Sequence, residues 1–375
     1  MKVTLVGHYP PPYGGVASLM KQIESALTRR GAKVSVFNLG SGRPAAANVQ
    51  NFDTTNRTRQ FLQLVRAFAV SDSDLFHYLS ASYRSFWLGA LCVVLARMTG
   101  RKIVLSVVGG AFKDFVSSLG PFRRRLASAC LGLCHAVVAC NTEIEEVLAA
   151  LAPRKRVYRM QNCFPLLADE KAELPDAVRD FFSAHSPVVC TTGAASAEYG
   201  LADAVDALSS LRQAFPGAGM LVALTKYGER AYEDGLVRKI QSLGLGEHVF
   251  IQSNLPDFVS VMKRSDVFLR STLVDGDSIS VREALFLGVP AVVSDTPFRP
   301  EGVILFRKGD ARDMAEKLAV TLRAERRSQV SKPLAESEGN LNALLSVYDS
   351  VLVARPSLES VSHDPRVGPR SGCGA

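Results

Sequence analysis

Two arginines and two acids surround one predicted helix start. From Arg270 to Glu283 the chain reads RSTLVDGDSISVRE, which places Asp275 ahead of the helix and Glu283 eight residues later, inside it. A helix N-terminus offers unpaired backbone N–H groups and a partial positive charge, and both favour a phosphate. Arg270 and Arg282 flank the loop and can add charge-assisted hydrogen bonds to the same anion. Short acidic and hydroxyl residues also cap helices, but a cap does not need two arginines, so the pattern favours an anion site.

Two apolar segments frame this loop and must position it. Residues 267–269 read as a buried strand before the loop, and residues 291–293 as a second strand after the helix that starts near Ser278 or Ser280. In open parallel sheets, ligands bind at the carboxyl ends of the strands. The unit therefore predicts a binding site at a sheet edge.

The same alternation of strands and helices extends over both halves of the chain, which predicts βαβ units and parallel sheets. We predict class α/β, with two doubly wound, Rossmann-like domains facing a cleft. The predicted segments are a first domain over 1–162, a linker rich in proline and charge over 163–186, a second domain over 187–330, a helix over 331–354 that can cross back to the first domain, and a disordered tail over 355–375.

Composition fits a globular protein, and the charge is unevenly spread. Of 375 residues, 47% are hydrophobic and 21% charged. Residues 1–180 hold 23 Lys+Arg against 13 Asp+Glu (+10), and the remainder holds 21 against 23 (−2), which together give the formal charge of +8. Basic clusters at 123–125 and 154–156 lie next to apolar residues, which suits an anionic membrane surface or an acidic substrate, although a merely solvated face explains them equally well. No aromatic-interleaved or helix-turn-helix pattern supports nucleic acid as a partner.

Cysteine usage and the N-terminus indicate the compartment. The seven cysteines form no Cys-x-x-Cys pair, so we predict buried free thiols in a reducing environment. The N-terminal apolar run is too short for a signal peptide, and the longest apolar stretches fall short of a membrane span or are interrupted. We therefore predict a soluble, cytoplasmic protein, with peripheral attachment to the inner face of the cell membrane as an option.

Nearly the whole chain, to about residue 325, resembles the retaining glycosyltransferases of the GT-B group called family 4, which use nucleotide-sugar donors. The resemblance is most specific from residue 265 to 295. The family's acid–seven residues–Glu motif matches Asp275 and Glu283, followed by Ala284-Leu285 and Gly288-Val289-Pro290. The family usually has glutamate at the first position, so Asp275 carries its carboxylate one methylene nearer the backbone. The form RSTxxDGDSxSVREAL resembles a subgroup found among bacterial exopolysaccharide and capsule transferases.

The resemblance implies roles for individual residues. Asp275 contacts the sugar, and Glu283 holds the ribose hydroxyls. The backbone of Ser278, Ile279 and Ser280 holds the diphosphate. The glycine-rich loop at Gly14 and Gly15 lets backbone N–H groups approach the donor phosphate or the acceptor, although Gly-Gly after prolines is also an ordinary turn.

Two cations of the family are missing. The Gly-Arg and Lys-Gly elements that neutralise the leaving diphosphate read Gly193-Ala194 and Tyr199-Gly200 here. Charge that develops on a leaving diphosphate needs a positive group to stabilise it. We predict Arg270 as the catalytic substitute and Arg282 as a donor-binding one, with Lys226 as a third cation.

The acceptor side has no evident general base. Relatives often carry a histidine at the strand end where Val108 stands, just before Gly109 and Gly110. His8 and His77 are the remaining candidates near strand ends, although a histidine in such a place is more often packed or capping than catalytic. In retaining transferases of this kind the leaving phosphate is thought to take the acceptor's proton, so no base is assigned.

Asp275-Gly276-Asp277 also matches the Asp-x-Asp metal signature of the other glycosyltransferase fold, and Asp72-Ser73-Asp74 shows the same spacing. Because arginines are available, we predict no metal and no cofactor beyond the nucleotide-sugar substrate.

The predicted function is sugar transfer from a nucleotide diphosphate to a glycan, with a lipid-linked acceptor in surface polysaccharide synthesis. An epimerase, a phosphorylase and an inactive GT-B partner that binds a sugar nucleotide or another transferase remain alternatives. A dinucleotide-dependent oxidoreductase is disfavoured, because the first strand is not followed by Gly-x-Gly-x-x-Gly.

Overall fold

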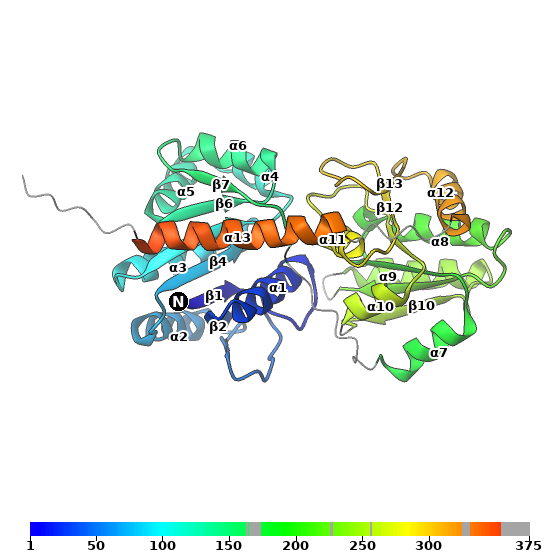
Figure 1. Ribbon diagram of the computed structural model, residues 1–375, viewed down its shortest axis with the longest axis horizontal. Helices are drawn as coiled ribbons and strands as arrows, with labels where there is room; N and C mark the ends of the chain where they lie inside the picture. Colours follow the sequence, from blue (N-terminus) through cyan, green and yellow to red (C-terminus); the bar gives the residue numbers. More distant parts are fainter. Residues whose placement is uncertain (163, 165–173, 226–227, 256, 325–330, 354–375) are drawn as a thin grey trace, which may run out of the picture.

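The computed structural model describes residues 1–162, 164, 174–225, 228–255, 257–324 and 331–353. Two α/β domains lie next to each other along the long axis of the molecule, the N-terminal one at the left of Figure 1. The predictions for Cys163, Lys226 and the tail over 355–375 fall outside the described residues.

The first domain is built on a parallel sheet. Its seven described strands run in the order β3 (Val49–Asn51), β2 (Lys33–Asn38), β1 (Lys2–Gly7), β4 (Leu75–Ser80), β5 (Lys102–Val107), β6 (Ala136–Ala139) and β7 (Val157–Arg159). The central strands are buried and largely apolar, because helices cover both of their faces; Thr4, His77 and Ser106 are buried polar residues inside them. One face packs against α2 (Arg57–Val70), α3 (Arg84–Met98), α4 (Phe112–Ser117), α5 (Pro121–Leu133) and α6 (Thr142–Leu151).

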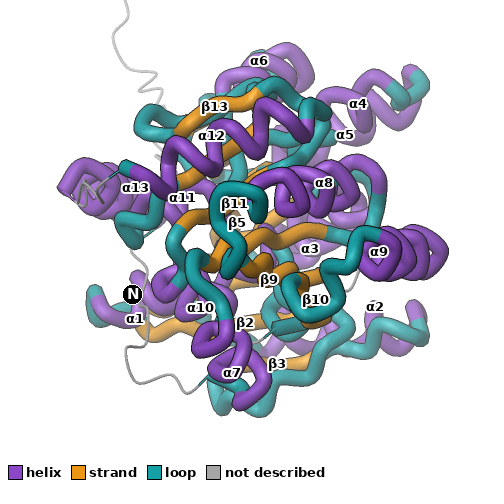
Figure 2. The backbone as a smooth tube through the Cα atoms, turned by 90° about the vertical axis from the view of Figure 1, so that its right-hand side faces the viewer, coloured by secondary structure: helices purple, strands orange, loops and turns teal. Residues whose placement is uncertain are grey.

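The second domain repeats this design. Its six described strands run in the order β10 (Val249–Ser253), β9 (Gly219–Leu224), β8 (Val188–Gly193), β11 (Val267–Arg270), β12 (Ala291–Ser294) and β13 (Ile304–Phe306). Figure 2 shows α8 (Leu201–Leu211), α9 (Arg230–Ser242) and α12 (Ala311–Arg323) around one side of this sheet. The other side packs against α7 (Asp176–Ala184), α10 (Phe258–Arg264) and α11 (Ile279–Phe286).

In both parallel sheets the order in which strands are added reverses next to the first strand, between β1 and β4 and between β8 and β11. Such a switch point leaves a crevice at the carboxyl ends of the strands, where ligands bind. The fold prediction of two doubly wound parallel-sheet domains is confirmed.

Some elements differ from the sequence prediction. Strand β3 and helix α4 were not predicted, because three and six residues carry too little periodicity. Helix α7 lies inside the predicted linker. Its Val178 and Phe181 are buried in the core of the second domain, so residues 176–184 belong to that domain.

Helix α13 (Ser331–Val353) and helix α1 (Gly15–Arg29) cover the remaining face of the first sheet. In Figure 1, α13 begins beside α11 and runs across the first domain. Its Leu344, Val347 and Tyr348 share one core with Val3 and Leu5 of β1. The chain therefore passes to the second domain and returns, and its last described helix is packed onto the first.

The cysteines in the described residues are free and buried (Cys92, Cys130, Cys134, Cys140 and Cys190). No described helix is long and apolar enough to cross a bilayer.

Candidate active site

A cavity of about 340 Å³ lies between the two domains, within the size range of small-molecule sites. The second domain contributes the carboxyl ends of β8, β9 and β11 and the start of α11. The first domain contributes the start of α1 and the loop after β5. Of the residues predicted from the sequence, the cavity is lined by Gly14, Gly15, Gly110, Gly193, Arg270, Asp275, Ser278, Ile279, Ser280 and Glu283.

The N-terminus of α11 points an uncapped first turn at this cavity. Ser278 is the N-cap residue in extended conformation, and its side chain makes no capping hydrogen bond to the helix. Its hydroxyl instead lies 3.2 Å from that of Ser280. The backbone N–H groups of the first turn are therefore not used by a side-chain cap and suit an anion.

Arg270 closes β11 and lies against the floor of the cavity. Its Nε and Nη2 donate to the two carboxylate oxygens of Asp275 at 2.9 and 3.2 Å, and its Nη1 donates to the Thr192 carbonyl at 3.0 Å. The guanidinium also lies 5.3 Å from the centre of the Tyr199 ring. Three of its five N–H groups are thus used within the described residues, which leaves two for a ligand.

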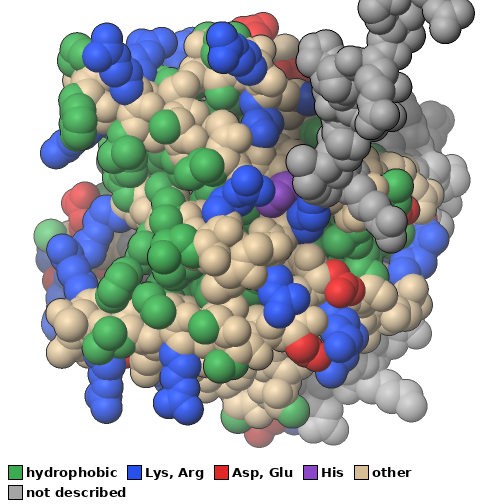
Figure 3. Space-filling view, turned by 90° about the vertical axis from the view of Figure 1, so that its left-hand side faces the viewer, with side chains coloured by type: hydrophobic (Ala, Val, Ile, Leu, Met, Phe, Trp, Pro, Cys, Tyr) green, Lys and Arg blue, Asp and Glu red, His purple; other side chains and the backbone are tan. Residues whose placement is uncertain are grey.

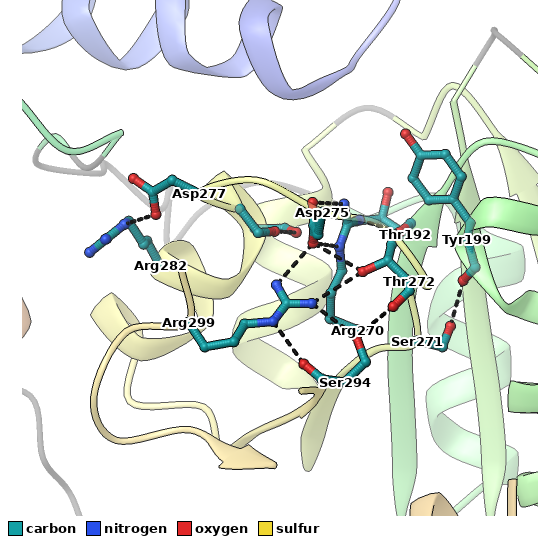
Figure 4. Close-up of polar contacts among 12 residues, drawn as sticks. Thr192, Tyr199, Arg270, Ser271, Thr272, Asp275, Asp277, Arg282, Ser294 and Arg299 are labelled. Atoms are coloured by element: carbon teal, nitrogen blue, oxygen red, sulfur yellow. Dashed lines mark hydrogen bonds and ion pairs between the residues drawn. The ribbon is translucent and has the colours of Figure 1, made fainter. Parts of the chain in front are cut away.

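Arg299 is a second cation at this place, and it was not predicted from the sequence. Its Nη1 donates to Asp275 at 2.9 Å and its Nη2 to Thr272 at 3.1 Å, while its Nε holds the Ser294 carbonyl at 2.9 Å (Figure 4). Arg299 does not line the cavity, so it acts by positioning Asp275. It follows Pro297 and Phe298 in a loop with no charge pattern, and no sequence signal pointed to it.

Asp275 is shared by the two arginines. Its Oδ2 accepts from Arg270, Arg299 and Thr272. Burial acts to raise the pKa of Asp275, but the two guanidinium groups outweigh it and lower the pKa below the usual value. One carboxylate against two guanidinium groups leaves a net charge of +1. Oδ1 accepts from Nη2 of Arg270 alone, so it has more room than Oδ2 for the predicted contact with the sugar.

Glu283 lies one turn into α11 and faces the cavity from a buried position. Its Oε1 accepts a hydrogen bond of 2.7 Å from Nε2 of Gln22, which comes from α1 in the first domain. Burial raises the pKa of Glu283 to about 8, and the bond from Gln22 offsets only part of that effect. A group that can hold hydroxyls is thus already bonded across the domain boundary.

The prediction that Arg282 faces the donor is wrong. Its Nε donates to Asp277 at 2.6 Å and its Nη1 to the side-chain oxygen of Gln161 at 3.2 Å, and the residue does not line the cavity. Asp277 in turn accepts from the backbone N–H of Asn162 at 3.1 Å. The pair therefore joins the two domains, and its charges cancel.

His77 is not on the acceptor side of the cleft. It lies in the middle of β4, with Nδ1 2.6 Å from the Tyr348 hydroxyl and Nε2 2.6 Å from the Ser106 hydroxyl. Burial lowers its pKa to about 3, so the ring is neutral and structural.

Two further acceptor-side predictions also fail on position. Gly109 packs closely on Ala81 and Ser82, so that a Cβ there would lie 2.9 Å from the Ser82 hydroxyl. His8 is exposed, and neither residue lines the cavity. Gly110 does line it, and its backbone lies against that of Gly276 across the domain boundary.

Lys21 is a cavity residue that the sequence analysis did not identify. It lies on α1, is exposed, and lines the cavity wall opposite the second domain. Within the described residues no carboxylate lies in ion-pair distance of it, unlike Arg270 and Arg282. A spacing signal could not reveal it, because only the packing of the two domains brings α1 to the site.

Asp275 and Asp277, the two acids of the Asp-x-Asp match, each accept from arginine. Within the described ranges, no group of three His, Cys, Asp or Glu side chains is arranged to hold a metal ion.

Two sheets with the same order of strand addition, a cleft between them and a helix start suited to a phosphate fit a site for a nucleotide. Residues 179–331 match the family described as Glycosyl transferases group 1. The second domain is therefore a group 1 glycosyltransferase domain, and the chain is a glycosyltransferase, as the sequence predicts.

Solved structures extend the similarity to the whole fold, which is GT-B. HepE from Anabaena, in complex with UDP and glucose, is 14% identical with a TM-score of 0.70, over 93% of this chain and 99% of its own. Sucrose-phosphate synthase from Thermosynechococcus elongatus is 17% identical with a TM-score of 0.69, over 95% and 100%. A UDP-N-acetylglucosamine 2-epimerase assigned in Listeria monocytogenes is 14% identical with a TM-score of 0.63, over 93% and 96%. No curated protein matches this sequence.

Proposed function

We propose that this protein transfers a sugar from a nucleotide-diphosphate sugar to a glycan acceptor, with retention at the anomeric carbon. The observation that carries the proposal is the combination of a free helix start, Arg270 and Glu283 on one wall of the interdomain cavity. The helix start and Arg270 suit a diphosphate, and a buried carboxyl group suits the ribose hydroxyls.

Charge on the leaving group decides whether this site can work. In the transfer, the bond from the anomeric carbon to the donor phosphate breaks and a bond to the acceptor oxygen forms on the same face. The acceptor's proton passes to the leaving phosphate. The Arg270–Asp275–Arg299 cluster offers a net +1 beside the helix start, and Lys21 adds a cation from the opposite wall. These groups would take the place of the two cations that the family-4 pattern has and this chain lacks.

Among nucleotide sugars, a UDP-sugar is the donor that we propose. HepE is a structural neighbour whose crystals contain UDP-glucose, at 15% identity and a TM-score of 0.67. The acceptor that we propose is a lipid-linked glycan in the synthesis of a surface polysaccharide. We propose that the transfer takes place in the cytoplasm. The strongly basic first 180 residues support an acceptor that carries anionic phosphate.

A thermal-shift panel of nucleoside diphosphates and nucleotide sugars tests the proposal. We expect one nucleotide series to raise the melting temperature, and the matching nucleotide sugar to release its nucleoside diphosphate when a glycan acceptor is added. Anomeric retention is read from the NMR coupling constant of the new linkage. No stabilisation by any nucleotide contradicts the proposal.

An inactive partner that only binds a sugar nucleotide is the second candidate. The engagement of Glu283 by Gln22 and the saturation of Asp275 Oδ2 favour it, because both acids are already bonded. Stabilisation by a nucleotide sugar with no release of nucleoside diphosphate, over a broad acceptor set, identifies this case. Interconversion of free sugar epimers without an acceptor would instead indicate an epimerase.

A further inference from the structure

Three neighbouring helices on one side of the first domain carry basic residues and no acids. Helix α3 packs between α2 and α5 over the same face of the sheet. Together the three helices hold eight arginines and no aspartate or glutamate in 42 residues. The corresponding outer helices of the second domain, α8, α9 and α12, hold six acids and six basic residues. We call the first surface the α2–α3–α5 face.

The arginines of this face have almost no carboxylate partners. Within the described part of the chain, the one carboxylate within 4 Å of any of them is Asp53, which lies 3.7 Å from Arg59. Arg123, Arg124 and Arg125 are all exposed. Their charge is therefore directed at solvent or at a partner.

Large apolar side chains are exposed among these arginines. Nine of the seventeen exposed large hydrophobic residues of the described chain lie on these three helices. Phe122 of α5 is 79% exposed, Met98 of α3 is 78% and Leu62 of α2 is 60%. Figure 3 views the first domain from the left-hand side of Figure 1. It shows hydrophobic side chains gathered on one half of this side, with Lys and Arg at their margins. A contiguous apolar patch of this kind marks an interaction site.

The mixture of charge and apolar surface selects the partner. Exposed apolar side chains gain by entering the headgroup boundary of a bilayer, while the arginine head groups stay at the anionic surface. A second copy of the face would bring eight arginines against eight arginines. Nucleic acid would bind the arginines but would leave the apolar side chains without a partner, because its interfaces are polar.

We propose that the α2–α3–α5 face docks the protein on a lipid bilayer that contains anionic phospholipid. Basic groups near such a surface each add to binding and lose their effect in salt. This docking does not depend on sugar transfer, because none of the residues of α2, α3 or α5 lines the interdomain cavity.

Co-sedimentation with vesicles, in the absence of donor and acceptor, tests the docking. One set of vesicles contains phosphatidylcholine alone and the other adds phosphatidylglycerol. We expect binding to the mixed vesicles, weakened about tenfold or more by Arg123→Glu/Arg124→Glu/Arg125→Glu and by high salt. Met98→Ser/Phe122→Ser should weaken binding to the vesicles as well. Because both side chains are already exposed, the melting temperature of this variant should not change.

Val320→Ser, an exposed apolar change on α12 of the second domain, is the matched control and should bind like the wild type. The proposal is overturned if the mixed vesicles do not bind the wild type, or if the face variants bind as well as the control. It is also overturned if the apolar variant abolishes a dimer in vesicle-free solution, because the face would then join two copies of the chain. Because nucleotide binding is measured separately, a failure of docking leaves the proposed function standing.

Discussion

Arg270 and Arg299 share Asp275, and the net charge of +1 that this leaves suits the diphosphate of the proposed donor. The shorter aspartate side chain reaches both guanidinium groups from the loop that precedes α11. Since a charge-assisted bond is stronger in a buried place, the cluster is held in one geometry before a ligand arrives.

Removal of the Arg299 side chain should therefore weaken donor binding, although Arg299 does not itself line the cavity. For Arg299→Ala we expect Kd of the nucleoside diphosphate to rise by about tenfold, because Asp275 then pulls Arg270 without a competing cation. Isothermal titration measures this change. Arg299→Lys should recover part of the affinity, whereas a structural role alone would lower the melting temperature and leave Kd unchanged.

Glu283 gives the folded protein a distinctive pH dependence. The folded chain holds this proton up to about pH 8, whereas the unfolded chain releases it near 4.5. The stability from the bound proton is therefore fully present below the lower value and is lost as the pH rises through the upper one. Glu283→Gln cannot ionise, so its free energy of unfolding should fall less over this window, by on the order of a few kcal/mol.

Chemical denaturation at a series of pH values measures the difference between the two proteins. Parallel stability curves for wild type and Glu283→Gln would show that Glu283 ionises normally in the folded state.

At the scale of elements, α13 joins the end of the chain to the first sheet. Its Tyr348 is fully buried and its hydroxyl contacts His77 in the centre of β4. This bond satisfies a ring nitrogen that has no access to water, so it fixes the register of the helix on the sheet.

Tyr348→Phe removes the hydrogen bond between α13 and β4 and should lower the free energy of unfolding. The change leaves the Nδ1 atom of His77 without a partner and should cost about 1–3 kcal/mol of unfolding free energy. Urea denaturation measures the loss, and Tyr83→Phe, at a tyrosine that is 49% exposed, is the matched control. Equal stability of the two variants would contradict the assigned role of α13.

Most strands were predictable because parallel strands buried on both faces are nearly continuous apolar runs. The start of α11 was predictable as well, since Ser278 and the preceding acids are typical of an N-terminus. Strand β3 and helix α4 are too short for a pattern, and α7 was hidden in a segment whose composition suggested a linker.

Across the whole molecule, the parts of the site that escaped prediction are those that depend on three-dimensional packing. The position of Arg282 in the sequence suits a contact with phosphate, but its side chain forms an ion pair with Asp277. Sequence spacing alone does not decide between these two partners. Lys21 and Gln22 reach the cavity because α1 of the first domain faces α11 of the second. The motif thus located the site, while its charged wall is assembled by both domains.

The central claim is that Arg270 binds the diphosphate of the donor in the interdomain cavity. Isothermal titration of the nucleoside diphosphate into wild type, Arg270→Ala and Arg270→Lys tests it, with Arg312→Ala, an exposed arginine on α12, as the control. We predict that Kd rises by about 10- to 100-fold in Arg270→Ala, less in Arg270→Lys, and stays constant in the control. An unchanged Kd in a folded Arg270→Ala protein would contradict the claim.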